Sequence, residues 1–159
     1  MKIGILSDTH GIWRPQIERC FEGVELILHA GDVGRVDILE NLSAIAPVSA
    51  VRGNVDDYAE AAYLPAEIET EIEGIRFLLR HVGCNVGAAP GDLKRLLLLR
   101  GIGVFLFGHS HKTYSEYLDS TLFFNPGAAG PRRFSLPLTV ATMEIEAGRL
   151  TWKFRELAH

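Results

Sequence analysis

The first half of the chain alternates short apolar runs with segments whose apolar residues recur at helical spacing. The apolar runs predict strands, and they are KIGIL (2–6), VELILHA (24–30) and PVSAVRGN (47–54). The segments 13–22 and 34–45 predict helices, and in the second of them Val36, Leu39 and Leu42 share one face. Strands that alternate with helices in this way are typical of a mostly parallel sheet.

From residue 66 the hydrophobic period becomes two, which is typical of strands that are exposed on one face. In 66–74 glutamates alternate with Ile68, Thr70 and Ile72, and Gly74 turns the chain into a second strand over 75–81. A helix over 93–101 ends at Gly101. The later strand-like segments are 102–111, 112–118, 120–127, 138–146 and 149–157.

Ala147 and Gly148 are expected to join the last two strands in a hairpin, in which Leu150, Trp152 and Phe154 face inward. Together the elements predict an α/β fold of two packed sheets with helices outside, built as a single domain over 1–159. The alternative is a Rossmann-like single sheet. That alternative fits the first half of the chain and leaves the last third unexplained.

Composition narrows the class of protein. With 159 residues, 47% of them hydrophobic and 23% charged, the chain has the make-up of an ordinary soluble domain. No apolar run approaches the ~20 residues that span a bilayer, and MKIGILSD reaches an acidic residue too early for a secretory signal. A cytoplasmic protein without a membrane partner is therefore expected.

Charge and cysteine usage agree with this expectation. Cys20 and Cys84 match neither a disulfide framework nor a CxxC zinc site, as expected in a reducing compartment. The formal net charge of −4 gives no electrostatic reason for binding to a nucleic-acid backbone. An anionic substrate therefore has to be held by something local, such as a metal.

Metal-competent side chains follow five of the predicted strands. In GILSDTHG (4–11), side chains two positions apart on an extended segment point to the same side, so Asp8 and His10 converge. The full set of candidates is Asp8, His10, Asp32 (in HAGDVG), Asn54 (in VRGNVD), His81 (in LLRHVG), and His109 with His111 (in FGHSH). Seven oxygen and imidazole donors, including a carboxylate able to bridge, are typical of a two-metal site.

Each candidate also has a plainer explanation when it is taken alone. Asn54 and Asp56 fit an Asx turn, and His109 and His111 fit an exposed turn. A lone histidine after a strand is more often structural, and His29 is interpreted as a structural or supporting residue. Five such strand ends in one small domain favour the metal site.

The ordered motifs DTHG, GD, GN, a histidine after a hairpin, and GHSH resemble those of the calcineurin-like metallophosphoesterase superfamily. The short length and the segment NPGAAGPRR (125–133) are similar to its small YfcE-type phosphodiesterase branch. The resemblance covers residues 2 to about 133. It implies a four-layer α/β/β/α sandwich of two mixed sheets flanked by helices.

The resemblance also implies a ligand set for two divalent metal ions. Six residues divide between the two ions: Asp8, His10 and His111 on one, and Asn54, His81 and His109 on the other. Asp32 bridges the ions. Manganese is the expected metal, with iron, nickel, cobalt or zinc as alternatives.

Such a site predicts a hydrolytic reaction, in which Asp32, Asn54 and His10 are the catalytic candidates. Two divalent ions about 3.5 to 4 Å apart lower the pKa of a shared water, and the bridging hydroxide attacks the phosphorus of a small phosphoester in line. A phosphodiester is the favoured substrate. Because only Asp8 and Asp32 are anionic, the loaded site keeps a formal charge of about +2 that attracts phosphate. Asn54 is neutral, and its amide can donate to a phosphate oxygen.

Two positions depart from the family pattern. Val55 stands where many members have a histidine that protonates the leaving group, which predicts a preference for leaving groups that depart without a proton, such as aryl groups. The branch usually reads Thr-His-Gly-His where this chain has Arg80-His81-Val82-Gly83-Cys84. Cys84 is more simply a packing residue than an auxiliary ligand or a redox handle.

The segment 125–133 has two interpretations. In one it is a rim loop in which Asn125 fixes the turn and Arg132 or Arg133 reaches the substrate. In the other, which we favour, it is a Pro/Gly turn with two solvated arginines. Edge strands in the last third of the chain also offer a route to a homo-oligomer.

Two other functions compete with hydrolysis. A protein-binding scaffold of the same fold, as in the retromer subunit, predicts degraded ligand positions, whereas all seven positions here carry ligating side chains. A nuclease of this superfamily would need a capping domain and a basic surface, and the short acidic chain favours neither.

Overall fold

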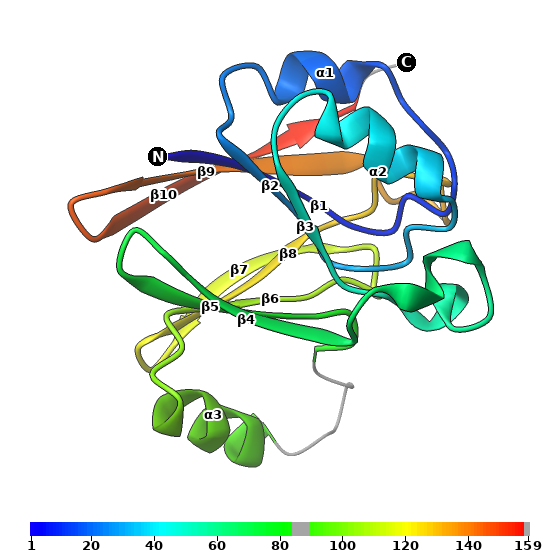
Figure 1. Ribbon diagram of the computed structural model, residues 1–159. Helices are drawn as coiled ribbons and strands as arrows, with labels where there is room; N and C mark the ends of the chain where they lie inside the picture. The colour runs from blue at the N-terminus through cyan, green and yellow to red at the C-terminus, as the bar shows by residue number, and fades with distance from the viewer. Residues whose placement is uncertain (84–89, 158–159) are drawn as a thin grey trace.

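The computed structural model describes residues 1–83 and 90–157, so that Cys84 and any role for it lie outside the described residues. The first sheet has the strand order β10-β9-β1-β2-β3 (Figure 1). Its strands are β1 (Lys2–Leu6), β2 (Leu26–His29), β3 (Val48–Ala50), β9 (Thr139–Glu146) and β10 (Arg149–Glu156). The first three are parallel, and β9 and β10 form an antiparallel hairpin beside β1, so the sheet is mixed.

The second sheet has the order β4-β5-β6-β8-β7. Its strands are β4 (Glu67–Ile72), β5 (Ile75–Arg80), β6 (Val104–Leu106), β7 (Thr113–Leu118) and β8 (Thr121–Pro126). Here β5, β6 and β8 are parallel, whereas β4 and β7 run antiparallel at the two edges. The single-sheet alternative is therefore wrong, because the second half of the chain builds a sheet of its own.

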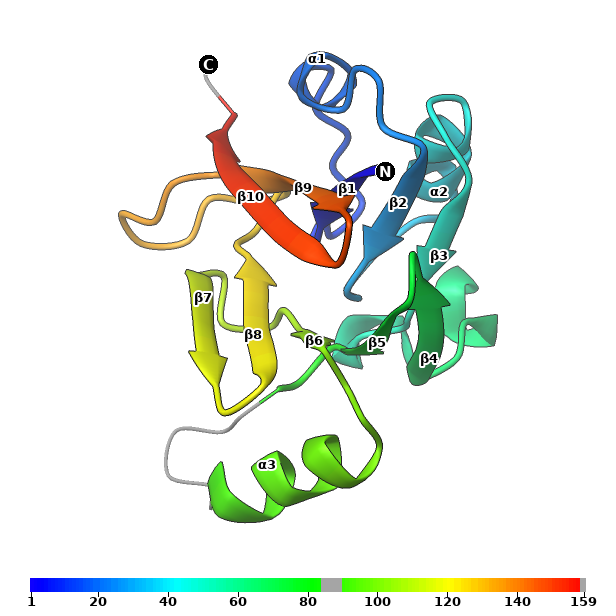
Figure 2. The same ribbon diagram turned by 90° about the vertical axis from the view of Figure 1, so that its left-hand side faces the viewer.

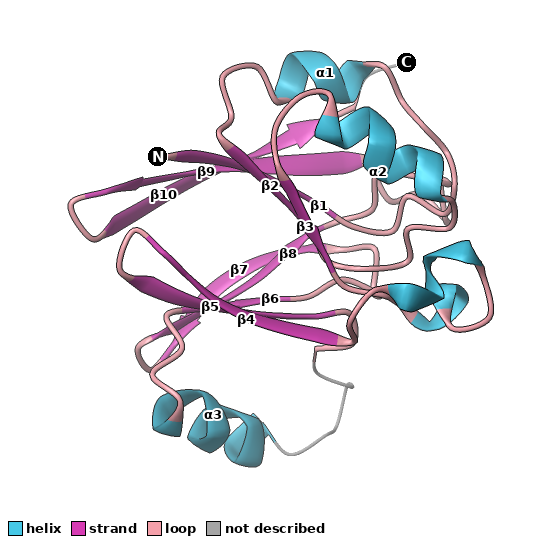
Figure 3. Cartoon of the chain, viewed as in Figure 1, coloured by secondary structure: helices cyan, strands magenta, loops and turns pink. Residues whose placement is uncertain are grey.

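Helices cover the outer faces of both sheets (Figures 2 and 3). The helices α1 (Gln16–Cys20) and α2 (Val36–Ser43) lie on the first sheet, and α3 (Pro90–Leu99) lies on the second. Two short 3-10 turns, η1 (Asn54–Asp56) and η2 (Glu60–Tyr63), follow β3. The four-layer α/β/β/α sandwich is confirmed. No helix in the described ranges has both the length and the apolar character needed to cross a bilayer.

Three buried clusters hold the layers together by removing apolar surface from water. Ile17, Ile38 and Leu42 pack α1 and α2 against the first sheet. Between the sheets, side chains from β1 and β9 meet side chains from β5, β6 and β8, and the inward-facing Leu150, Trp152 and Phe154 pack against this cluster as expected. Leu97 anchors α3 to the second sheet.

Several element bounds differ from the sequence-based expectation, and the strand expected over 102–111 spans only Val104–Leu106. The helix expected over 13–22 spans only Gln16–Cys20: Pro15 occupies its N-cap, and the side chain of Arg14 before it donates to Gly130 O. The strand expected over 47–54 ends at Ala50, and the backbone N–H of Arg52 donates to Pro65 O instead of extending the sheet. Asn54 consequently lies in a turn. β7 and β10 are edge strands, and pairing of two copies through them stays a prediction.

Candidate metal centre

The loops that follow β1, β2, β3, β5 and β6 lie at one side of the molecule, on the right in Figure 1. Backbone hydrogen bonds join them: Asp8 N–H donates to Gly31 O at 2.9 Å, and His10 N–H donates to Asp32 O at 2.9 Å. In the second sheet, Gly108 N–H after β6 donates to His81 O after β5 at 2.9 Å. The parallel strands of both sheets therefore bring their following loops together.

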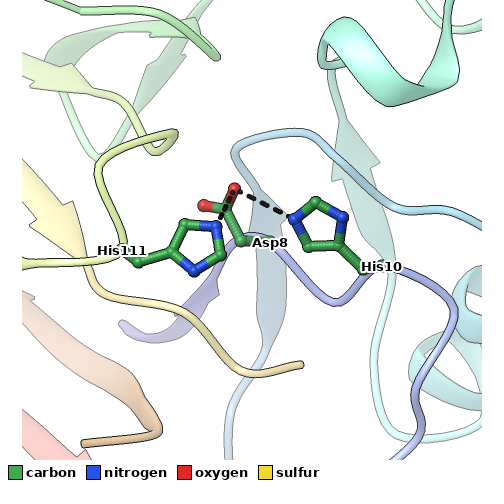
Figure 4. A group of neighbouring side chains, drawn as sticks. All are labelled: Asp8, His10 and His111. Atoms are coloured by element: carbon green, nitrogen blue, oxygen red, sulfur yellow. Dashed lines mark ion pairs between the residues drawn. The ribbon is translucent and has the colours of Figure 1, made fainter. Parts of the chain in front are cut away.

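Asp8, His10 and His111, which we call the first group, offer ligand atoms that all lie within 4.8 Å of one another. Asp8 stands between the two imidazoles (Figure 4). Its Oδ1 lies 3.2 Å from His111 Nε2 and 3.6 Å from His10 Nε2. One carboxylate oxygen thus faces two ring nitrogens that come from different sheets.

Asp32, His81 and His109, the second group, meet the same 4.8 Å criterion. Asp32 Oδ2 lies 3.1 Å from His81 Nε2. The two groups are neighbours, because His10 Nε2 lies 3.6 Å from Asp32 Oδ2 and His81 Nε2 lies 3.8 Å from Asp8 Oδ1. The arrangement offers two adjacent cation positions.

In each carboxylate one oxygen is anchored by the protein and the other is left for the imidazoles. Asp8 Oδ2 accepts hydrogen bonds from Ser7 Oγ at 2.7 Å and from His109 N–H at 3.1 Å. Asp32 Oδ1 accepts from Val55 N–H at 3.0 Å. These bonds fix the direction in which the free oxygens point.

The hydrogen bonding of the other ring and carboxylate atoms shows whether these residues could bind a cation. His81 Nδ1 donates to Ala30 O at 2.8 Å, which leaves the lone pair of Nε2 facing the site. Within the described residues, four buried atoms of this site have no hydrogen-bond partner: Asp8 Oδ1, His10 Nε2, His81 Nε2 and His111 Nδ1. Unpartnered polar atoms are costly in a protein interior, and a bound cation would satisfy them. The donor set fits divalent metals.

The pKa values of three groups respond to these contacts. Burial would raise the pKa of Asp8, but its close contacts with His10 and His111 and the charge of His81 outweigh burial and hold the pKa well below its ordinary value. The pKa of Asp32 is also lowered, since the contact with His81 outweighs burial. Burial lowers and Asp32 raises the pKa of His81, and the net shift is upward.

The backbone at this site is unusual. Among the described residues, nine other than glycine have a positive φ, and five of these nine belong to the two groups: Asp8, His10, Asp32, His109 and His111, with φ between 47° and 71°. Left-handed backbone is unfavourable for side chains with a Cβ, and such residues cluster at functional sites. Here the positive φ turns each ligand out of its strand direction.

Two glycines allow the loops to approach the carboxylates. A Cβ on Gly53 would lie 2.0 Å from Asp32 Oδ1, and a Cβ on Gly108 would lie 2.1 Å from Ser7 Oγ, the hydroxyl that anchors Asp8. Neither distance is compatible with a side chain. The glycines of the GN and GH motifs are thus required by close packing around the ligands.

The family profile described as "Calcineurin-like phosphoesterase superfamily domain" matches residues 1–148. The chain belongs to this superfamily.

Similar proteins agree with this membership. A probable metallophosphoesterase of Methanothermobacter thermautotrophicus is 34% identical over 155 residues, which cover 94% of this chain and 89% of the relative. A phosphodiesterase of Methanocaldococcus jannaschii is 30% identical over 165 residues, covering 92% of this chain and 94% of the relative. The crystal structure of Vps29 from Chaetomium thermophilum superposes with a TM-score of 0.82 at 19% identity, covering 99% of this chain and 86% of that structure, and shows the shared fold.

Membership in a metallophosphoesterase superfamily implies divalent metals, and the two groups are the candidate positions for them. Six of the seven ligands expected from the sequence lie together in the structure: Asp8, His10, Asp32, His81, His109 and His111. Asn54, the seventh, is exposed in η1 beside Val55, whose N–H binds Asp32, so it borders the second group. Metal ligation by all seven stays a prediction.

The structural interpretation of His29 agrees with its contacts. The ring is fully buried, Nδ1 accepts from Gly31 N–H at 3.1 Å, and Nε2 lies 3.0 Å from Thr9 Oγ1. Thr9 Oγ1 donates onward to Val33 O at 2.9 Å, so His29 Nε2 donates to Thr9. Burial lowers the pKa of His29 to about 4. A neutral ring with both nitrogens used has no lone pair left for a metal.

Asn125 fixes its turn as expected: Oδ1 accepts from Gly127 N–H at 2.9 Å, and Nδ2 donates to Gly108 O at 3.0 Å. Arg132 and Arg133 are exposed, and their contact with substrate stays a prediction. The sequence interpretation missed Ser7 and considered Asp56 only as part of an Asx turn, whereas both anchor the site through hydrogen bonds. An acidic residue two positions after the GN motif was the only available signal for Asp56.

Proposed function

We propose that this chain is a dinuclear metal-dependent phosphodiesterase that hydrolyses a small phosphoester. The observation that carries the proposal is the pair of adjacent groups whose buried ring and carboxylate atoms lack hydrogen-bond partners. A structural cluster would satisfy those atoms with protein donors, as His29 does nearby. The family and the names of the relatives supply the reaction class.

The first group would hold one divalent cation and the second group, with Asn54, the other. Asp32 would be the carboxylate shared by both cations, since its Oδ2 faces both His10 and His81. Bound there, two divalent ions would supply a nucleophile near neutral pH by lowering the pKa of a shared water, and would stabilise charge on the phosphoryl oxygens. Manganese is our expected metal, and iron, nickel, cobalt and zinc are the alternatives.

The chain's own residues set the charge and the orientation of the substrate. Asp8 and Asp32 are the only anionic ligands among the seven, so they do not cancel the charge of two divalent cations, and a phosphate anion is attracted. Asn54 and His109 are exposed. Asn54 adjoins Val55, whose N–H donates to Asp32, and the backbone N–H of His109 itself donates to Asp8. We assign them the contacts to the phosphoryl oxygens at the open side of the site.

The environment of Val55 determines the leaving groups that the site accepts. Its backbone N–H donates to Asp32 Oδ1. Its side chain is 40% exposed and has no ionisable proton to donate to a leaving group. We therefore expect a strong dependence of kcat on leaving-group pKa, because departure without protonation is easier for aryl oxides than for alkoxides. Val55→His should flatten that dependence. An equally flat dependence in the wild-type protein would contradict this assignment.

The direct test is a metal-loading series with a chromogenic aryl phosphodiester. Metal-stripped protein is reconstituted with manganese, iron, nickel, cobalt or zinc, and the bound metal and the turnover are measured for the wild type and for Asp32→Ala. Two bound equivalents with turnover in the wild type alone support the proposal. Two bound metal equivalents without turnover of diesters or monoesters favour the alternative of a protein-binding scaffold. The Vps29 structure has the same fold as this chain.

A further inference from the structure

Asp56 is a fully buried carboxylate that lies outside both groups. It accepts three backbone hydrogen bonds: from Val33 N–H at 3.0 Å, Gly34 N–H at 2.9 Å and Gly53 N–H at 2.9 Å. Two of the donors follow Asp32 directly in the chain, and the third precedes Asn54 directly. Asp56 therefore ties the loop after β2 to the loop after β3.

A carboxylate is the side chain that such a position requires. It accepts on two oxygens and has no donor hydrogen, so it can meet three N–H groups at once. An asparagine there would turn an NH₂ group toward at least one N–H donor. The donors would then be left unpaired in the interior, where an unmade hydrogen bond is costly.

The contacts of Asp56 favour the second group over the first. Its donors adjoin Asp32 and Asn54, whereas the Asp8 carboxylate is held by Ser7 Oγ and His109 N–H instead. We propose that Asp56 is a positioning residue that sets the separation of Asp32 and Asn54 and thereby the affinity of the second-group cation. The proposal rests on the proposed two-metal site. It concerns binding, so it can fail or hold whether or not the protein is a hydrolase.

The experiment isolates each cation position and then replaces the Asp56 carboxylate. His111→Ala leaves the second group as the high-affinity position, and His109→Ala leaves the first group. Asp56→Asn is added to each background, and manganese affinity is measured by calorimetric titration of the metal-stripped protein. Cobalt, added separately, reports the coordination geometry through its visible absorption spectrum. Unfolding in EDTA establishes that each variant is folded.

The expected result is selective. Asp56→Asn weakens manganese binding about 10- to 100-fold in the His111→Ala background, the usual effect of an outer-shell partner, and changes the cobalt spectrum there. In the His109→Ala background the cation keeps Asp8, His10 and His111, so a displaced Asp32 should cost it less than about threefold in affinity, well below that outer-shell range. The matched control is Thr121→Val, which removes a buried hydrogen bond to Ile102 O at the opposite end of β8 and leaves both affinities unchanged.

Equal weakening in both backgrounds, or no weakening in either, overturns the proposal and assigns Asp56 to the fold alone. Absence of any manganese binding in the wild type overturns both this proposal and the proposed function. Two bound equivalents without turnover overturn only the proposed function. If Asp56→Asn does not fold without metal, Asp56→Glu keeps the acceptors while shifting them by one methylene, and the same criterion decides.

Discussion

The two groups of the candidate metal centre differ in how far the protein encloses them. In the first group Asp8 is completely buried and His111 is 4% exposed, and two hydrogen bonds hold the Asp8 carboxylate. In the second group Asp32 and His81 are buried, but His109 is exposed, and the neighbouring Asn54 is exposed as well. The first position is built into the interior and the second opens to solvent.

This difference indicates that the two cation positions have different roles in one site. A cation among buried, anchored ligands loses little side-chain entropy on binding, so the first position should bind its cation more tightly. A position with exposed neutral ligands leaves room for a phosphate to enter. We expect the second cation to exchange faster and to respond more strongly to substrate. The predictions below test this asymmetry.

The largest effect is expected where the two groups meet. Asp32 Oδ2 lies 3.6 Å from His10 Nε2 and 3.1 Å from His81 Nε2, so Asp32→Ala removes a ligand atom shared between the positions. We expect kcat/KM for an aryl phosphodiester to fall at least about 10³-fold, because the residues act as a unit. Circular dichroism in EDTA controls for folding. A folded Asp32→Ala variant with turnover within about tenfold of the wild type would contradict the shared-ligand geometry, since a lost shared ligand should cost far more.

Single imidazoles should separate the two positions. His111→Ala and His109→Ala should each abolish one of two manganese equivalents, with a loss in affinity beyond the ~100-fold expected for an outer-shell residue. The asymmetry predicts that the equivalent remaining in His109→Ala binds more tightly than the one remaining in His111→Ala. Calorimetric titration of both variants measures this order directly, and the reverse order would show that burial does not set affinity here.

Chain order and strand ends made most of this site predictable. Parallel strands deliver their following loops to one end of a sheet, so the motifs after β1, β2, β5 and β6 converge whatever the details of packing. The sequence does not reveal the roles of Ser7 and Asp56. Ser7 Oγ donates to the neighbouring Asp8 carboxylate, and Asp56 accepts from backbone N–H groups of other loops, which carry no residue signature. Such anchoring emerges only when every backbone hydrogen bond is traced.

Histidines illustrate the same limit. His29 is the last residue of β2, His81 directly follows β5, and both are buried. What distinguishes them is the second ring nitrogen: in His29 it meets Thr9, and in His81 it faces Asp32 without a hydrogen donor of its own. The positive φ at five ligands is equally hidden in the sequence, since Asp and His tolerate that conformation without requiring it.

Removal of the Ser7 hydroxyl should loosen the first group alone. Ser7 Oγ donates to Asp8 Oδ2 at 2.7 Å, and Ser7→Ala leaves only the His109 N–H to orient that carboxylate. We expect manganese affinity in the His109→Ala background to fall about tenfold, at the low end for outer-shell partners. Ser43→Ala, at the exposed end of α2, is the control. A similar loss in the His111→Ala background would mean that the two groups are not anchored independently.

Lowering the pH should release the second cation. Asp32 raises the pKa of His81 above its ordinary value of 6.5 against the effect of burial, so a proton competes with metal at His81 Nε2. As pH falls through that raised pKa, affinity in the His111→Ala background should drop by about tenfold per pH unit, and above it the affinity should level off. His29 does not contribute, because its pKa is lowered to about 4. Titrations from alkaline to mildly acidic pH check the slope, and a constant affinity across that range would argue against ligation by His81.

The smallest expected effect concerns the backbone conformation of His109, in the second group. His109 is exposed with φ 71°, so an alanine there keeps the left-handed strain while a glycine relieves it. Both variants lose the same ligand, yet His109→Gly should exceed His109→Ala in free energy of unfolding by about 1 kcal/mol, measured with urea in EDTA. The Gly and Ala variants of neighbouring Ser110, which lacks a positive φ, should show no advantage for glycine. Equal stability of the two His109 variants would mean that the loop relaxes when its ligand is gone. The same comparison is not clean at His111, because truncating a buried ring leaves a cavity whose cost masks the strain.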